Sequence, residues 1–174
     1  MTCFGKRNKK TKKNTPSLIN KLINKFLQRM MWMDISKRVK NLVRMYNTHD
    51  PIRIAKLKGI EVEYYDLGEI KGFYKKILGN KFIGLNDTIG EFSILVSSGH
   101  ELGHDVLHST KQIQLMKDYV LLPKDNVIEI QANKFVAELL LYEGANYDYI
   151  LKSGTELDKK ILKMLIDLKN TNIS

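Results

Sequence analysis

A chain of 174 residues, 43% of them hydrophobic and only three of them proline, is long enough for one domain with a sizeable core and is not composed like a disordered protein. Its net charge of +10 is unevenly distributed. Residues 1–34 contain nine Lys or Arg and one acid (+8), whereas residues 35–174 contain 20 basic and 18 acidic side chains (+2). This nearly neutral remainder argues against a nucleic-acid-binding domain as the whole protein.

Several other classes of protein are disfavoured by the sequence. No apolar run reaches the roughly 18 residues that a membrane span needs, and no secretory signal pattern is visible. Cys3 is the only cysteine, which excludes an internal disulfide and fits a reducing compartment. We expect a cytoplasmic protein that uses no small-molecule cofactor.

The N-terminal extension, residues 1–34, is expected to be separate from a domain at residues 35–174. It begins with a basic, low-complexity segment at residues 5–15, and an amphipathic helix is predicted after Pro16. That helix could pack on the domain, on a partner or on a membrane surface, and contact with nucleic acid or membrane is expected only through this extension. Alternatively, translation starts at Met31 or Met33.

The first half of the domain alternates between helical and strand patterns. Asp50 is predicted to cap a short helix with Pro51 in its first turn, and Gly79-Asn80 is predicted to form a tight turn. The elements expected here are helices at 35–46 and 52–57 and strands at 60–65, 72–77 and 81–86.

The second half is predicted to be helical. Thr88 and Glu91 form a capping-box pattern that would open a helix, and the glycines within it, Gly99 and Gly103, suggest that another segment approaches closely. The elements expected are this helix, a loop at 109–124 and helices at 125–143 and 155–168. The fold class is therefore α+β: a small, three-stranded, mostly antiparallel sheet with a helical layer.

The central helix carries the sequence His100-Glu101-Leu102-Gly103-His104. Residues four apart lie on one face of a helix, so His100 and His104 could hold one zinc ion while Glu101 reaches its bound water. A bare HExxH motif also arises by chance, and the alternative is a polar helix face with solvated or core histidines.

A catalytic zinc site needs a third protein ligand, and three residues are candidates. His108 lies about 12 Å from His100 along the helix axis, too far for both to share an ion, and is better suited to an outer or capping role at the helix end, where the dipole favours its cation. Glu129 begins a separate helix and is the preferred ligand, with Glu138 in reserve. Asn133, one turn after Glu129, could accept a hydrogen bond from a ligating histidine.

The sequence resembles the ImmA/IrrE-type zinc metallopeptidases of bacteria and their mobile elements. The resemblance covers residues 35–142 and rests on HELGHDVLH followed by EIQANKFVAELL, with VKNLVRMYNTHDPIRIAKLKGIEVEYYDL, GFY and FIGLN upstream. It implies one zinc ion bound by His100, His104 and Glu129, with Glu101 as general base. Gln131 is a departure, since the family often has an acid there.

The resemblance also implies a function. Family members cleave a helix-turn-helix repressor, so the expected substrate is a repressor of a mobile element or stress regulon. The alternative is a non-catalytic or toxin–antitoxin-associated binding module that retains the metal site.

Two further features of the mechanism are left open by the sequence. Tyr74, Tyr119 and His108 are candidates for stabilising the oxyanion. An extended substrate is expected to pair with the strand at 81–86, interpreted as a sheet edge.

Overall fold

The computed structural model describes residues 33–108, 114–116, 127–143 and 145–171, and the unit discussed here runs from Asp34 to Ile173. The predicted N-terminal helix lies outside the described residues. The expected domain boundary at residue 34 lies at their margin, and it stays a prediction. No helix in the described part of the chain is long and apolar enough to cross a membrane.

The first two helices of the unit begin at aspartate caps. In α2 (Ile35–Tyr46) the Asp34 side chain accepts a hydrogen bond from the backbone N–H of Lys37. Asp50 likewise caps α3 (Pro51–Leu57), with Pro51 at its first position, as predicted. The interhelical segment is short because Asn47 adopts a left-handed conformation at the end of α2.

The sheet has four strands in the order β1-β3-β2-β4. Strand β2 is antiparallel to both β3 and β4, while β1 is parallel to β3. The α+β class and the mostly antiparallel sheet are confirmed, with one strand more than expected, since β4 comes from the segment predicted to be a loop. The strands are β1 (Ile60–Tyr65), β2 (Gly72–Ile77), β3 (Asn80–Asn86) and β4 (Gln114–Met116).

Strand β3 is central, so its interpretation as a sheet edge is wrong. The β2–β3 hairpin folds back so that β3 enters between β2 and β1 and pairs with both along its length. Its turn consists of Leu78 and Gly79, both with positive φ, and Ile77 pairs with Asn80. The turn thus lies one residue earlier than predicted, and it resembles the mirror-image type favoured in two-residue hairpins.

The capping box predicted for the next helix is also wrong. Helix α4 (Glu91–Leu107) starts after Gly90 with no side-chain cap. The backbone N–H and hydroxyl of Thr88 instead donate to Asn86 Oδ1, at 2.9 and 2.7 Å. The Asn86 side chain is fully buried, and its amide nitrogen donates to the carbonyls of Gly68 and Ile70 in the loop between β1 and β2. These contacts fix its Oδ1 where Thr88 can donate to it, and Thr88 is then not available to cap α4.

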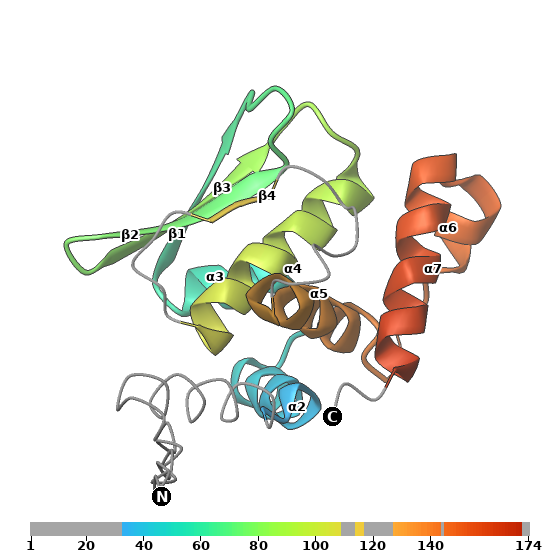
Figure 1. Ribbon diagram of the computed structural model, residues 1–174, viewed down its shortest axis with the longest axis horizontal. Coiled ribbons are helices and arrows are strands. Elements are labelled where there is room, and N and C mark those ends of the chain that lie inside the picture. Colours follow the sequence, from blue (N-terminus) through green and yellow to red (C-terminus); the bar gives the residue numbers. More distant parts are fainter. Residues whose placement is uncertain (1–32, 109–113, 117–126, 144, 172–174) are drawn as a thin grey trace, which may run out of the picture. The chain divides into compact units, whose positions relative to one another are not determined.

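Helix α4 lies between the sheet and α5 (Val127–Leu140), as Figure 1 shows. Thirteen of its 17 residues are buried, because strands cover one side and α5 covers the other. The close approach predicted from its glycines is confirmed. A Cβ added at Gly103 would lie 3.1 Å from the Phe135 ring, and one at Gly99 would lie 3.4 Å from Val136.

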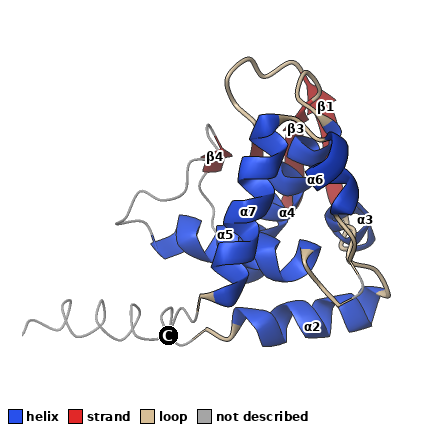
Figure 2. Ribbon diagram, turned by 90° about the vertical axis from the view of Figure 1, so that its right-hand side faces the viewer, coloured by secondary structure: helices blue, strands red, loops and turns tan. Residues whose placement is uncertain are grey.

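The C-terminal helices pack against the N-terminal end of α4 and against α5. In Figure 2, α6 (Asp148–Ser153), which was not predicted, and α7 (Glu156–Asn170) lie in front of α4. The last helix begins at a capping box formed by Thr155 and Asp158. Its buried face joins a core cluster composed of Phe92, Val96, Val136, Ala137, Leu140, Ile150, Ile161, Leu162, Met164 and Leu165.

Lys134 fastens α5 to the end of α7. Its ammonium group, on a buried side chain, donates to the carbonyls of Leu168 and Lys169 at 2.7 and 2.9 Å. It also pairs with Glu138 at 3.1 Å. A cation at the C-terminal carbonyls of α7 offsets the negative end of the dipole of that helix, so Lys134 stabilises the packing of α7 against α5.

Gly103→Val is expected to lower the free energy of unfolding by about 1–3 kcal/mol, because the added methyl groups meet Phe135 in a closely packed helix contact. Urea denaturation followed by circular dichroism measures the change. Gly90→Ser is the matched control, because no atom lies within 4 Å of an added Cβ there. The same loss of stability in both variants would contradict close packing as the cause.

Candidate metal centre

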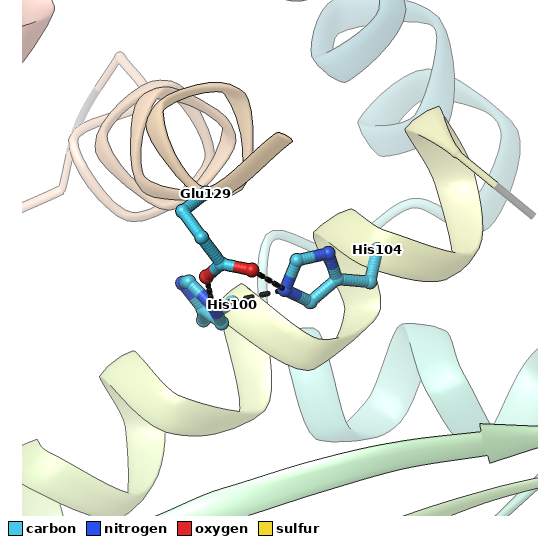
Figure 3. Close-up of side chains that lie close together, drawn as sticks. All are labelled: His100, His104 and Glu129. Atoms are coloured by element: carbon cyan, nitrogen blue, oxygen red, sulfur yellow. Dashed lines mark hydrogen bonds and ion pairs between the residues drawn. The ribbon is translucent and has the colours of Figure 1, made fainter. Parts of the chain in front are cut away.

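The two motif histidines present their Nε2 atoms to each other from one face of α4. These atoms are 3.0 Å apart, and both rings are buried, with His100 3% and His104 0% exposed. The four-residue spacing places the rings one turn apart on the side of α4 that faces α5 (Figure 3). Both histidines therefore lie on one face of α4, as expected from the sequence.

Glu129 reaches the histidine pair from the first turn of α5. Its Oε2 lies 3.0 Å from His100 Nε2, and its Oε1 lies 3.6 Å from His104 Nε2 (Figure 3). The carboxylate thus faces both nitrogens at once, with about a quarter of the side chain still exposed. The reserve candidate Glu138 pairs with Lys134 and is not part of this cluster.

These three side chains could hold a metal ion, since their ligand atoms all lie within 4.8 Å of one another. Ligand atoms around a tetrahedral zinc ion are roughly 3.3 Å apart, given bond lengths near 2.0–2.1 Å. The observed separations of 3.0, 3.0 and 3.6 Å bracket that value. Two imidazoles and one carboxylate are also a donor set that catalytic zinc sites use.

Asn133 fixes the orientation of His100. Its Oδ1 lies 2.9 Å from His100 Nδ1 and accepts the proton of that nitrogen. In the neutral ring the lone pair is then on Nε2 and is turned toward His104 and Glu129, whereas in the cationic ring Nε2 also carries a proton, which it donates to Glu129. This is the contact expected from the spacing of Glu129 and Asn133 along α5.

The charges within the cluster depend on one another. Burial by itself lowers the pKa of His100, but the Glu129 hydrogen bond and the charge of Glu101 raise it above its usual value. Burial lowers the pKa of His104. The hydrogen bonds from both histidines hold the pKa of Glu129 well below its usual range despite the burial of its carboxyl group. Glu129 is therefore a carboxylate in the folded protein.

Glu101 follows His100 in α4 and packs against strand β2, near enough to the cluster for the charges of His100 and Glu129 to act on it. The side chain is fully buried, and a Cβ added at Gly72 would lie 3.5 Å from its Cγ. Neither carboxyl oxygen has a hydrogen-bond partner of standard geometry among the described residues, although a weaker contact with the backbone of Tyr74 by itself lowers the pKa of Glu101. Burial, together with the charge of Glu129, raises the pKa of Glu101 to about 8. A carboxyl group with that pKa can both accept and release a proton near neutral pH.

Asp105 is an important buried residue that sequence reasoning missed. Its carboxylate accepts a hydrogen bond from the Tyr74 hydroxyl at 2.9 Å and pairs with Lys81 at 2.6 Å and Lys58 at 3.6 Å. These contacts join α4 to β2, to β3 and to the end of α3. The signal was present in the sequence, since an acid inside an otherwise buried helix must find partners.

The structure places two of the remaining candidates differently from the prediction. The Tyr74 hydroxyl donates to Asp105, and the burial of its ring raises its pKa further, so it is not directed at the histidine pair. His108 ends α4 as expected, but burial and the charge of His104 lower its pKa to about 4, so the predicted cationic form is wrong. Desolvation outweighs the helix dipole there. Tyr119 lies outside the described residues.

Residues 55–163 match the peptidase M78 family, described as the IrrE N-terminal-like domain. The chain belongs to this family. It is also 33% identical over 147 residues to a Bacillus phage phi105 protein named "Uncharacterized immunity region protein 2", an alignment that covers 78% of this chain and 92% of that protein. No solved structure matches significantly.

The family match extends further toward the C-terminus than the predicted resemblance, which ended at residue 142. It includes the first half of α7, and the structure gives the reason: Ile161 and Leu162 of that half belong to the core cluster beside α4 and α5. At the other end the match begins at residue 55, inside α3.

Glu129→Gln is expected to weaken zinc binding by more than about 100-fold, because it removes the charged ligand that faces both histidines. Glu138→Gln is the matched control on the same helix and should leave zinc affinity unchanged. Competition with a chromogenic chelator measures both affinities. The reverse order of effects would show that Glu138 is the ligand.

Asn133→Ala is expected to weaken zinc binding by about 10- to 100-fold without loss of a ligand, because His100 loses the acceptor that orients its ring. Asn133→Asp retains an acceptor oxygen and should remain close to the parent. The same chelator competition distinguishes the two, and an unchanged affinity in Asn133→Ala would exclude an orienting role.

Proposed function

We propose that this protein is a zinc-dependent, site-specific endopeptidase that cleaves a helix-turn-helix repressor. The observation that carries the proposal is the convergence of His100, His104 and Glu129 from two helices, with Glu101 directly after His100 in α4. Membership of a peptidase family supports peptide-bond hydrolysis as the reaction.

Each residue of the cluster has a distinct role in this proposal. His100, His104 and Glu129 would hold one zinc ion, which when bound supplies a Lewis acid that makes water nucleophilic near neutral pH. Glu101 takes the proton from the attacking water and passes it to the amine nitrogen as the peptide C–N bond breaks. Its burial suits this work, because a desolvated carboxylate binds a proton more strongly.

Strand β4 is a better candidate than β3 for pairing with an extended substrate. In the described part of the sheet β4 and β1 are the outer strands. Strand β4 pairs with β2 so that Met116 is opposite Gly72, the residue packed against Glu101. Strand β1 is separated from β2 by β3. A substrate added at β4 would therefore lie nearer to Glu101.

A repressor is the proposed substrate because the phage relative is named as an immunity-region protein. The resemblance described above implies the same substrate class. The second candidate function is a binding module that retains the metal site without cleavage. The two functions are distinguished by whether the repressor is cleaved.

Glu101→Gln is expected to reduce repressor cleavage by about 10²- to 10⁴-fold while zinc content and fold are retained, because the proton acceptor is lost and the ligands are not. Cleavage of a purified helix-turn-helix repressor, followed on gels, provides the measurement. His104→Ala should lose both zinc and cleavage.

The controls distinguish the two candidate functions. Cleavage by Glu101→Gln at the rate of the parent would overturn the proposed mechanism. A zinc-loaded parent that binds the repressor stably but leaves it intact would establish the binding module instead.

A further inference from the structure

The folded unit carries its charge very unevenly. Residues 35–58 contain seven basic side chains and one acid, a net charge of +6, whereas residues 59–174 contain 13 basic and 17 acidic side chains, a net charge of −4. The nearly neutral sum for residues 35–174 therefore conceals a strongly basic segment, and that segment comprises α2 and α3.

Three of these cations form a stripe along the outside of α2. Lys37, Lys40 and Arg44 are exposed and spaced three and four residues apart, so they follow one another along one face of the helix. The opposite face is apolar and buried, through Ile35, Val39 and Leu42. We refer to Lys37, Lys40 and Arg44 as the α2 stripe, which spans about 10 Å along the helix axis.

The spacing of the α2 stripe and the position of Lys37 are electrostatically unfavourable for the helix, although Arg44 in the last turn and the Asp34 cap complement its dipole. Like charges three or four residues apart destabilise a helix by about 0.2–0.5 kcal/mol per pair, and Lys37 lies in the first turn, at the positive end of the dipole. That first turn contains no acid. Within the described residues, none of the observed salt bridges involves the stripe.

Helix α7 shows that the chain follows the ordinary rule elsewhere. It has Glu156 and Asp158 in its first turn and Lys169 in its last, and Glu156 pairs with Lys159. These charges complement the dipole and one another. The first turn of α3 likewise contains no acid, so the excess of basic side chains is a feature of α2 and α3 together, and a partner that supplies negative charge would explain it.

We propose that the α2 stripe binds the phosphate backbone of double-stranded DNA. Cations alone are enough for such contacts, which depend on charge and not on base sequence. A membrane-binding helix would need an apolar face free to insert, whereas the apolar face of α2 is buried and only Met45 adds an exposed large hydrophobic side chain. A protein interface would usually be centred on aromatic or aliphatic anchors, which the stripe lacks.

This inference rests on the proposed function only for its biological setting. If the substrate is a repressor on its operator, a DNA-binding face on the peptidase would bring the two together on one duplex. The binding itself requires neither zinc nor cleavage, so it can be tested even if the protein proves not to be a peptidase.

The test compares two triple variants of the full chain with equal change in charge. K37Q/K40Q/R44Q removes the stripe, and K152Q/K160Q/K163Q removes three exposed lysines from α6 and α7. Binding to a fluorescein-labelled 30-base-pair duplex is measured by fluorescence anisotropy over a range of NaCl concentrations. Both variants retain residues 1–34, so any binding by that basic extension is common to both.

Loss of the stripe is expected to weaken binding by roughly five-fold per phosphate contact at 0.15 M salt, and so on the order of 100-fold for three. The slope of log K against log salt should fall in magnitude by about 2.7. The α6–α7 variant should change binding by less than about three-fold. The charge-preserving variant K37R/K40R/R44K should bind like the parent, which separates a charge effect from a loss of fold.

Three outcomes would overturn the proposal. These are equal weakening in the two glutamine variants, an unchanged salt slope in the stripe variant, and an absence of duplex binding by the parent even at low salt. Stripe-dependent binding to vesicles containing phosphatidylserine, without stripe-dependent binding to DNA, would assign the surface to a membrane instead. None of these measurements involves peptide cleavage, so they leave the proposed function untouched.

Discussion

The site depends on a helix that is covered on both sides while it carries four ionisable side chains within six residues. His100, Glu101, His104 and Asp105 are each at most 3% exposed. Burial of unpaired charges costs several kcal/mol each in a folded protein, so such a helix is stable only if the layers around it supply partners. The residues that pack against α4 must therefore also supply the partners of its ionisable side chains.

The partners differ between the two sides of α4. Toward the sheet, Asp105 is compensated by Lys81, Lys58 and the Tyr74 hydroxyl, which also hold β2 in place against the helix. Toward α5, the one carboxylate of the described residues that His100 and His104 contact is that of Glu129, and their Nε2 atoms face each other. A divalent cation would complete that second set, because it can bind the Nε2 lone pairs of both histidines and the Glu129 carboxylate at the same time. Glu101 lies between the two sets.

Much of this arrangement could be predicted from the sequence because the determining interactions are local. Caps at Asp50, strand alternation and the four-residue spacing of His100 and His104 each depend on neighbouring residues only. The pairing of Glu129 and Asn133 with the histidines requires in addition that α5 packs against α4. Gly99 and Gly103 predicted that some segment approaches α4 closely, without specifying which, and the structure shows that the segment is α5.

The errors have tertiary causes. Thr88 does not cap α4, because the buried Asn86 takes its hydrogen bonds. Strand β3 is central because the chain returns between β1 and β2, which no local pattern specifies. The pKa of His108 is lowered by burial, which a helix wheel does not reveal. Asp105 was passed over because its partners, Lys58, Tyr74 and Lys81, come from distant segments of the chain.

The separation of charge along the chain also bears on how a peptidase of this kind could be selective. The metal-binding cluster lies between α4 and α5, whereas the basic stripe lies on α2, which packs against α5 through its other face. Under the proposed repressor cleavage and DNA contact, binding of both proteins to one DNA molecule would raise their effective concentration, which reaches about the millimolar range for short tethers. Contacts around the scissile bond could then be modest, and proteins not bound to DNA would escape cleavage. Selectivity would arise from location as much as from recognition of the cleaved segment.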